Sequence, residues 1–319
     1  MKRHKKPIVH LYIRGNCGNQ FFQYAFARNI QEQVGGTLVI NYFRVRSDKA
    51  LLSGSDNLLQ HFNTVPYCYE ANPGFGGLIF RVLKLIHKLF RLETFQKRTY
   101  KFYLWCARVL PGFGIYYFDS AFYPFKIVRR NNIYINGYFE SAKYFEDIDE
   151  KICNELKPTH DLLECNQNLY SEINKRESVC VTIKRMDVNN ENIADIYQYD
   201  TSYFINAMNY ISERINNPLF VIFSDDLQWC RDNIKSDYDI RYESEGNPIW
   251  EKVRLMSGCK HFIIHNSTFS WWMQHLSQNP DKIVVAPSVW MLRNDQPIDI
   301  YEDNWIYIDN KGMVLSCHE

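Results

Sequence analysis

Residues 219–233 read LFVIFSDDLQWCRDN, and this stretch decides the fold class of the chain. The apolar run Leu219–Phe223 predicts a buried strand, and Leu227–Asn233 predict a helix that follows after a short polar turn. The same order of strand, turn and helix is repeated on both sides of this stretch, from Val179 to Ala286. Such alternation is typical of right-handed crossovers and a parallel sheet. The sequence therefore predicts an α/β fold.

The other strands and helices predicted in the C-terminal half alternate in the same way, as in a Rossmann-like fold. Strands are predicted at 179–183, 239–242, 262–264 and 283–286, and helices at 202–215, 249–257 and 269–277. Ligands of parallel sheets bind beyond the carboxyl ends of the strands. We therefore expect the loops at 184–188, 224–226 and 265–268 to converge on one crevice.

The N-terminal half begins with the same alternation and then becomes irregular. The sequence predicts a strand at 8–13, a tight turn at 15–18, a helix from Gln20 to about Val34, and strands at 37–42 and 133–136. Residues 44–76 contain several turn signals, so we expect loops there around one short helix at 57–62.

Two domains are expected from the length of 319 residues. The polar stretch that ends at Lys175-Arg176-Glu177 is the expected boundary, which gives an N-terminal α/β domain of residues 1–175 and a Rossmann-like domain of residues 176–319. A helical insertion at about 78–110 carries eight Lys or Arg and one acid. A basic amphipathic surface of this kind can rest on anionic lipid, and the plainer alternative is the solvated face of an acceptor domain.

Composition excludes several classes of protein. An apolar fraction of 46% with 23% charged residues is typical of globular chains and excludes a disordered one. The net charge of +1 provides no general attraction to nucleic acid, so no nucleic-acid partner is expected. Aromatic residues make up 16% of the chain. Their rings suit stacking on sugar faces, but we favour a role in the core.

Cysteine usage and hydropathy predict the compartment. Nine cysteines without a CxxC pair argue against a disulfide framework and a structural zinc site. The basic N-terminus is followed only by the short apolar run at 8–13, which argues against a signal peptide. No apolar stretch approaches the 18 residues of a transmembrane helix. A cytoplasmic protein is expected, with possible peripheral contact to the inner face of the membrane.

Two of the three loops of the second half could bind a nucleotide diphosphate through side chains. Lys184 and Arg185 follow the first strand, and such cations suit a pyrophosphate. Asp187, next to them, could orient or deprotonate an acceptor. After the second strand, Ser224-Asp225-Asp226 could accept hydrogen bonds from a ribose or a base. Capping of the following helix is the plainer role, and we expect it for Asp226.

The third loop, HNSTFSWW at 265–272, places hydroxyl residues where a strand ends and a helix begins. Exposed N–H groups and the positive end of a helix bind anions there. The plainer alternative is an ordinary helix cap followed by two core tryptophans. The chain has no Walker A loop, no GxGxxG, no nucleophile elbow and no metal-ligand spacing. The remaining pattern is electrostatic clamping of a diphosphate leaving group.

Two motifs resemble the family-11 glycosyltransferases, the α-1,2-fucosyltransferases. They are GNCGNQFFQYA at 15–25 and NSTFSWW at 266–272, with shorter matches such as GYFES at 137–141 between them. The resemblance implies a GT-B architecture, in which two Rossmann-like domains face each other across a cleft. It also implies GDP-β-L-fucose as the donor, inversion to an α-1,2 linkage on a galactose-type hydroxyl, and no essential metal. A cytoplasmic enzyme of this family would modify lipid-linked units of a surface polysaccharide.

The resemblance also implies roles for individual residues. The family motif HxRRxD corresponds to TIKRMD at 182–187, so Thr182 replaces the histidine and Lys184 replaces the first arginine. Another sugar nucleotide is therefore an open alternative, and so is a non-catalytic partner in a membrane-associated assembly complex. Asp187 is the first candidate for the general base and Glu140 the second, and Arg185 stabilises the leaving phosphate. The predicted donor-binding residues are Gly18, Asn19, Gln20, Lys184, Arg185, Ser224, Asp225, Asn266, Ser267, Thr268 and Ser270. For Asn19 and Gln20 the plainer alternative is a cap of the N-terminal helix.

Overall fold

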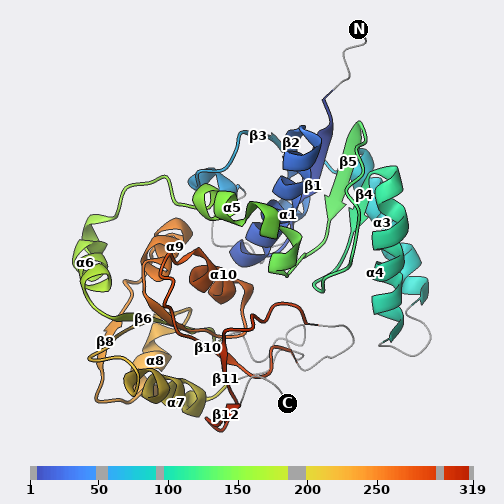
Figure 1. The fold of residues 1–319 in the computed structure, drawn as a ribbon. Helices are drawn as coiled ribbons and strands as arrows, with labels where there is room; N and C mark the ends of the chain where they lie inside the picture. Colours follow the sequence, from blue (N-terminus) through green and yellow to red (C-terminus); the bar gives the residue numbers. More distant parts are fainter. Residues whose placement is uncertain (1–5, 48–56, 91–96, 186–198, 292–297, 316–319) are drawn as a thin grey trace. The chain divides into compact units, whose positions relative to one another are not determined.

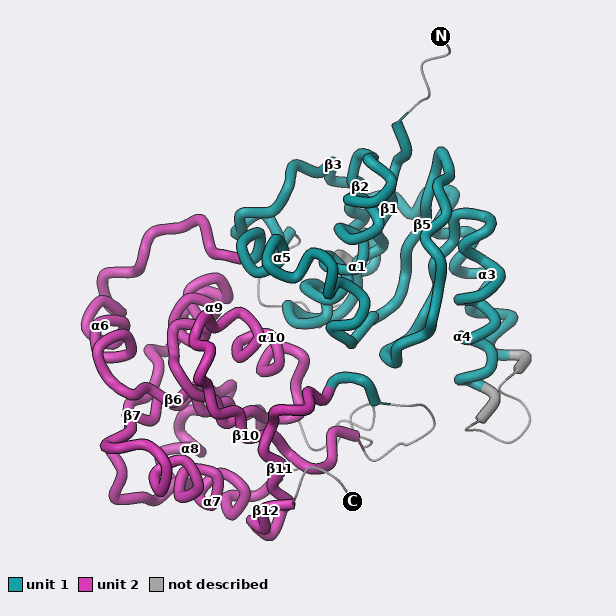
Figure 2. The backbone as a smooth tube through the Cα atoms, viewed as in Figure 1, with its two compact units in different colours: residues 1–156, 294–300 teal, residues 157–293, 301–319 magenta. Residues whose placement is uncertain are grey.

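The computed structural model describes residues 6–47, 57–90, 97–185, 199–291 and 298–315. The chain divides into two compact units, residues 1–156 with 294–300, and residues 157–293 with 301–319 (Figure 2).

The division falls after Leu156, earlier than the boundary expected at residue 175. The buried side chain of Asn166 accounts for this difference. Its Nδ2 donates to Asn247 Oδ1 at 2.8 Å and to Glu251 Oε1 at 2.9 Å. These bonds attach the segment before residue 175 to the second unit.

The first unit is built on a five-stranded parallel sheet in the order β3-β2-β1-β5-β4 (Figure 1). Its strands are β1 (Ile8–Tyr12), β2 (Thr37–Asn41), β3 (Tyr67–Glu70), β4 (Ile115–Tyr117) and β5 (Asn132–Asn136). Its helices are α1 (Cys17–Val34), α2 (Phe43–Ser47), α3 (Gly74–Phe90), α4 (Lys97–Val109) and α5 (Asp149–Glu155), with 3₁₀ turns η2 (Leu58–His61), η3 (Leu110–Phe113), η4 (Ala142–Tyr144) and η5 (Glu146–Ile148). The stretch expected as one helical insertion thus contains α3 and α4.

Several expectations for this unit need correction. The predicted turn at 15–18 is wrong at Cys17 and Gly18, because Gln20 N donates to Asn16 O at 3.0 Å and the helix already begins at Cys17. The expectation of loops around one helix at 44–76 missed α2 and β3, and β4 was also missed. Both missed strands are short and form the edges of the sheet, so neither shows a long apolar run.

The second unit has a seven-stranded sheet in the order β12-β11-β10-β9-β6-β7-β8. Its strands are β6 (Ser178–Ile183), β7 (Leu219–Ser224), β8 (Asp239–Tyr242), β9 (His261–Ile263), β10 (Val284–Pro287), β11 (Ile306–Ile308) and β12 (Val314–Leu315). Its helices are α6 (Gln167–Lys175), α7 (Thr201–Ser212), α8 (Leu227–Asn233), α9 (Ile249–Ser257) and α10 (Thr268–Leu276), with the 3₁₀ turn η6 (Glu164–Asn166). All pairs are parallel except β11 with β12. The predicted alternation is confirmed from β6 to β10, whereas the short strands β11 and β12 were not predicted.

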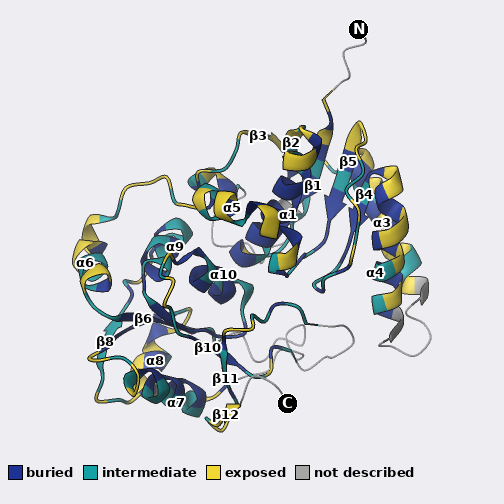
Figure 3. Cartoon of the chain, in the orientation of Figure 1, coloured by how far each residue is buried: buried dark blue, intermediate teal, exposed yellow. Residues whose placement is uncertain are grey.

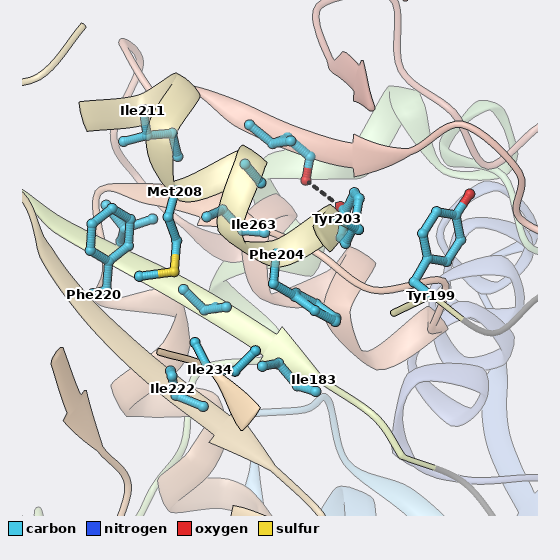
Figure 4. Close-up of a cluster of buried hydrophobic side chains, with 14 of the residues drawn as sticks. Ile183, Tyr199, Tyr203, Phe204, Met208, Ile211, Phe220, Ile222, Ile234 and Ile263 are labelled. Atoms are coloured by element: carbon cyan, nitrogen blue, oxygen red, sulfur yellow. Dashed lines mark hydrogen bonds between the residues drawn. The ribbon is translucent and has the colours of Figure 1, made fainter. Parts of the chain in front are cut away.

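The core of the second unit explains why its strands were easy to predict. Every residue of β6 is buried (Figure 3). Helix α7 packs Phe204 and Met208 against neighbouring strands (Figure 4). Tyr203 Oη donates to Ile264 O at 2.6 Å. A strand that is covered on both faces is apolar at successive positions, which produces a continuous signal in the sequence.

Aromatic side chains fill both cores, as favoured from composition. The largest fully buried side chains are Trp271, Trp272, Trp305, Tyr24, Tyr42, Tyr116, Tyr123, Tyr144, Tyr203, Phe21, Phe22 and Phe26. In the first unit, Phe26 stacks on Phe139 with a centroid distance of 4.0 Å. None of the helices among the described residues combines the length and apolarity that crossing a lipid bilayer requires.

In each sheet, the strands that follow the first strand are added on one side of it, and a later strand is then added on its other side. We call the place between these two sides the reversal point. In the first unit the chain runs from β1 to β2 and β3, and later places β5 on the other side of β1. In the second unit it runs from β6 to β7 and β8, and then places β9 on the other side of β6. Ligands of open parallel sheets bind outside the carboxyl ends of the strands at such points.

Candidate functional site

The three predicted loops lie side by side at the carboxyl edge of the second sheet. Asp225 Oδ1 accepts a hydrogen bond from Arg185 N at 2.7 Å, which joins the loops after β6 and β7. Thr182 Oγ1, near the carboxyl end of β6, accepts from His265 N at 2.9 Å, which joins β6 to the loop after β9. The predicted proximity is therefore confirmed for the described parts of the three loops, which lie at the reversal point between β6 and β9. Residues 186–188 lie outside the described residues, and the shared crevice remains a prediction.

Arg185 is held by its backbone and by an aromatic surface. Its guanidinium carbon lies 4.0 Å from the centre of the Trp229 ring, which belongs to the first turn of α8. Among the described residues, its buried Nε has no hydrogen-bond partner. A guanidinium stacked on an indole keeps its edge available for forked donation to phosphate oxygens. Trp229 was not predicted, because only the tertiary contact shows its role.

The loop after β7 is shaped by its own polar side chains. Asp226 Oδ1 accepts from Trp229 N at 2.9 Å and caps α8, as predicted. Ser224 Oγ accepts from Asp226 N at 3.0 Å. Asp225 accepts from the backbone of Arg185, as described above. The donor-binding roles of Ser224 and Asp225 remain predictions, and both side chains already position neighbouring backbone.

The loop after β9 is held by buried side chains and leads into the N-terminus of α10. Trp271 and Trp272 are fully buried, as in the plainer interpretation, and Ser270 is also buried. Asn266 Nδ2 donates to Trp290 O at 3.0 Å. Ser267 is the N-cap of α10, and within the part of the chain that the structure describes its side chain makes no capping bond. The positive end of α10, which starts at Thr268, is therefore not neutralised by its own cap.

The pKa of His265 is affected by the positive charges at this edge of the sheet. Its pKa is lowered to about 3, mainly by burial and also by the nearby charges of Lys184 and Arg185. Its imidazole is therefore neutral near pH 7. Within the described residues neither Lys184 nor Arg185 forms an ion pair. Two cations beside a neutral histidine and a helix N-terminus suit a dianionic ligand such as a diphosphate.

In the first unit, the loop after β1 is fixed by buried glutamines. Gly15 has a φ of +76°, and a Cβ there would lie 2.6 Å from Asn19 Nδ2. Gln20 is fully buried and its Nε2 donates to Gly15 O at 3.0 Å. Gln23 bonds both the N–H and the carbonyl of Arg14, at 2.9 and 2.8 Å. Among the described residues no side chain caps the start of α1, and Gln20 instead donates from within the helix to a carbonyl of the preceding loop. Gly18 is buried in the first turn of α1, and the donor-binding roles of Gly18, Asn19 and Gln20 remain predictions.

A second group of ionisable residues gathers at the reversal point of the first sheet. The guanidinium of Arg14 lies 3.9 Å over the ring of Tyr138, and its Nη2 lies 4.0 Å from Asp119 Oδ1. The pKa of Glu140 is raised to about 7, mainly by burial and less by the charge of Asp119, while the hydrogen bond from Ser120 and the charge of Arg14 oppose the shift. A carboxylate that titrates near neutrality suits a general base. Sequence reasoning named Glu140 but missed Arg14 and Asp119, which only the strand order brings together.

The turn after β5 fixes the position of Glu140. Phe139 adopts a φ of +54°, a conformation that is rare for a phenylalanine. Stacking on Phe26 holds its ring in place. A Cβ on Gly137 would lie 2.2 Å from the Phe118 carbonyl oxygen, so only glycine fits. Constrained backbone of this kind is common at functional sites, where a side chain must be held in one orientation.

We expect Gly137→Ala to lower the free energy of unfolding by about 1–3 kcal/mol, because its methyl group would overlap a backbone oxygen. Chemical denaturation measures the loss. Gly112→Ala is the matched control, since a Cβ on Gly112 meets nothing within 4 Å. Equal stability of the two variants would show that the turn is not constrained as described.

Asp187, the first candidate for the general base, lies outside the described residues. Its role remains a prediction.

Comparison with known proteins identifies the family. The profile of Glycosyl transferase family 11 matches residues 8–309. An alpha-1,2-colitosyltransferase from Escherichia coli is 29% identical over 314 residues, which cover 95% of this chain and 99% of that protein. A galactoside 2-alpha-L-fucosyltransferase from Caenorhabditis elegans is 27% identical over 290 residues, covering 87% and 71%.

A solved structure supports the fold. The NodZ alpha-1,6-fucosyltransferase co-crystallized with GDP matches with a TM-score of 0.51 and 13% identity, and the match covers 98% of each chain. The fold is therefore the mixed α/β fold with parallel sheets found in GT-B enzymes. The family match spans both reversal points and the loops around them. The chain is thus a glycosyltransferase, and it belongs to glycosyl transferase family 11.

Proposed function

We propose that the protein transfers L-fucose from GDP-β-L-fucose to the 2-hydroxyl of a galactose-type acceptor, with inversion at the anomeric carbon. The observation that carries this proposal is the pair Lys184 and Arg185 beside the open terminus of α10. The names of two relatives support the linkage, since one is an alpha-1,2-colitosyltransferase and the other a galactoside 2-alpha-L-fucosyltransferase. The GDP in the NodZ crystal agrees with a GDP-linked donor.

The reaction is a single displacement. The acceptor oxygen forms a bond to the anomeric carbon while the bond to the diphosphate breaks, and the hydroxyl proton passes to a carboxylate. Arg185, Lys184 and the N–H groups at Ser267 and Thr268 stabilise the negative charge that grows on the departing diphosphate. Asp187 or Glu140 accepts the proton. The titration of Glu140 near pH 7 supports it in this role.

A closely related donor is the second candidate. Colitose is L-fucose without its 3-hydroxyl group, and one relative is named for its transfer. Thr182 and Lys184 depart from the family motif in the loop that should contact the diphosphate. The threonine at position 182 has a structural role of its own, because its hydroxyl accepts a hydrogen bond from His265 N. Residues 186–198, which follow these motif positions in the chain, lie outside the described residues.

A donor panel tests the proposal. The purified protein is incubated with a β-galactoside and, in separate reactions, GDP-fucose, GDP-colitose, GDP-mannose or UDP-galactose, and product masses are measured. We expect transfer from GDP-fucose, and its persistence in EDTA because protein cations neutralise the diphosphate. Transfer from UDP-galactose alone would refute the proposed donor class. Transfer from GDP-colitose alone would establish the second candidate.

We further propose that the natural acceptor is a lipid-linked saccharide used in surface polysaccharide or oligosaccharide synthesis, modified at the inner face of the membrane. The family resemblance motivates this acceptor class. Extracted lipid-linked saccharides that accept no fucose, beside a soluble β-galactoside that does, would argue against it.

A further inference from the structure

Helix α3 of the first unit is apolar on two opposite sides. One side is buried and includes Phe80 and Leu83. The opposite side is exposed although it is also apolar. Its side chains, with their exposed fractions, are Phe75 (66%), Leu78 (57%), Val82 (48%) and Leu85 (61%). Their spacing of three and four residues places them in one continuous stripe.

The buried side of α3 already has its partners. The ring of Phe80 lies 5.2 Å from that of Tyr12 in β1 and 5.7 Å from that of Tyr117 in β4. The core of the first unit is therefore complete without the exposed stripe. A contiguous exposed apolar stripe on a globular protein marks an interaction surface more often than chance.

Cations border this stripe. Arg81, Lys84 and Lys88 are exposed on α3, and neither α3 nor α4 contains an acidic residue. On α4, which packs beside α3 (Figure 1), the exposed Trp105 lies between Lys101 and Arg108 at a spacing of four and three residues. We call this surface the α3–α4 face. It consists of Phe75, Leu78, Val82, Leu85 and Trp105 with Arg81, Lys84, Lys88, Lys101 and Arg108.

We propose that the α3–α4 face binds the surface of an anionic lipid membrane. Leucine, phenylalanine and tryptophan side chains enter the boundary between head groups and acyl chains, and adjacent lysines and arginines contact lipid phosphates. The long basic side chains can bury their stems and keep their charges at the head groups. The charge of the face favours this partner over a second copy of the chain, because a symmetric dimer would bring like charges together.

The face is connected to the edge of the first sheet at which Arg14 and Glu140 lie. Tyr12 is the last residue of β1 and its hydroxyl donates to Pro73 O at 2.9 Å, directly before α3 begins. The loop that carries Arg14 starts immediately after Tyr12. Membrane binding through α3 would therefore hold the edge with Arg14 and Glu140 near the lipid surface. Such a position would suit a lipid-linked acceptor, but membrane binding itself does not depend on the proposed function.

Vesicle co-flotation of the full chain tests this proposal. We expect binding to phosphatidylcholine vesicles that contain phosphatidylglycerol, weak binding to phosphatidylcholine alone, and partial release by salt. Leu78→Ser with Leu85→Ser should weaken binding by about 10-fold for each leucine. Lys84→Ser with Lys88→Ser should weaken it by about five-fold for each charge.

The matched controls lie in the second unit. Met313 is 61% exposed and Lys311 is also exposed, so Met313→Ser and Lys311→Ser remove one apolar and one basic side chain from another surface. Both should bind like the wild type. Failure to bind anionic vesicles, or equal binding by the Leu78/Leu85 variant, would overturn the proposal. So would a dimer that the leucine variant abolishes in the absence of vesicle binding. The readout is independent of transfer activity, so a negative donor panel leaves it intact.

Discussion

Replacement of Arg185 by alanine should lower kcat by about 100- to 1,000-fold, the loss typical of removing one preorganised donor to a developing negative charge. The guanidinium is already oriented by its contact with Trp229 at 4.0 Å, and Asp225 holds its backbone. Its contribution should therefore be largest in the transition state, when the diphosphate gains charge. Steady-state kinetics with GDP-fucose and a β-galactoside measure the effect, and thermal unfolding verifies that the variant is folded.

Arg231 provides the matched control. It lies on α8, is exposed, and its guanidinium stacks over Tyr242 at 4.3 Å, so it shares the chemistry of Arg185 at a different place. Arg231→Ala should keep kcat within about two-fold of wild type, because exposed charges contribute little. Arg185→Lys should recover only part of the activity, since it restores the charge without the fork. Equal turnover by wild type and Arg185→Ala would refute the proposed clamp.

Replacement of Glu140 by glutamine should lower kcat by about 100- to 10,000-fold if this carboxylate is the general base. Burial raises its pKa to about 7, and only the deprotonated form can accept the acceptor proton. The wild-type rate should therefore rise with pH through about 7 and then level off. The glutamine variant should lose this rise. A pH–rate profile of both proteins measures the effect.

Glu146→Gln is the control for this prediction, because Glu146 is an exposed carboxylate of the same unit. It should leave both the rate and its pH profile unchanged. If Glu140→Gln retains the wild-type rate and the rise near pH 7, the base is another group, and Asp187 becomes the first candidate again.

The same pKa has a consequence for stability that does not require catalysis. The folded protein binds the proton of Glu140 more tightly than the unfolded chain, whose value is near 4.5. Protonation of Glu140 therefore adds to the free energy of unfolding at low pH, and this addition is lost as the pH rises from about 4.5 to about 7. Glu140→Gln should remove that part of the decline, which separates an effect on folding from an effect on the reaction.

The central strands β6, β9 and β10 of the second unit were predictable because they are buried along their whole length, unlike the unpredicted β11 and β12. Burial of all six residues of β6 requires consecutive apolar side chains, and these are visible in the sequence without knowledge of any partner. Asp226 was predictable for a similar local reason, since an N-cap bonds its own helix. The edge strands β3 and β4 lack such a signal, because they are short and pair on one side only.

The sequence by itself determined the fold class, the family, and the loops that contain Lys184, Arg185 and Ser267, because each depends on a local pattern of a few residues. Only the tertiary structure decided which distant side chains meet. The strand order β1-β5-β4 brings Arg14, which follows β1, to Tyr138 after β5 and to Asp119 after β4. The packing of α8 places the ring of Trp229 against the guanidinium of Arg185. Likewise, helical periodicity identifies two apolar stripes on α3 but cannot say which of them faces the core. That choice depends on contacts between residues far apart in the chain, and no local pattern records it.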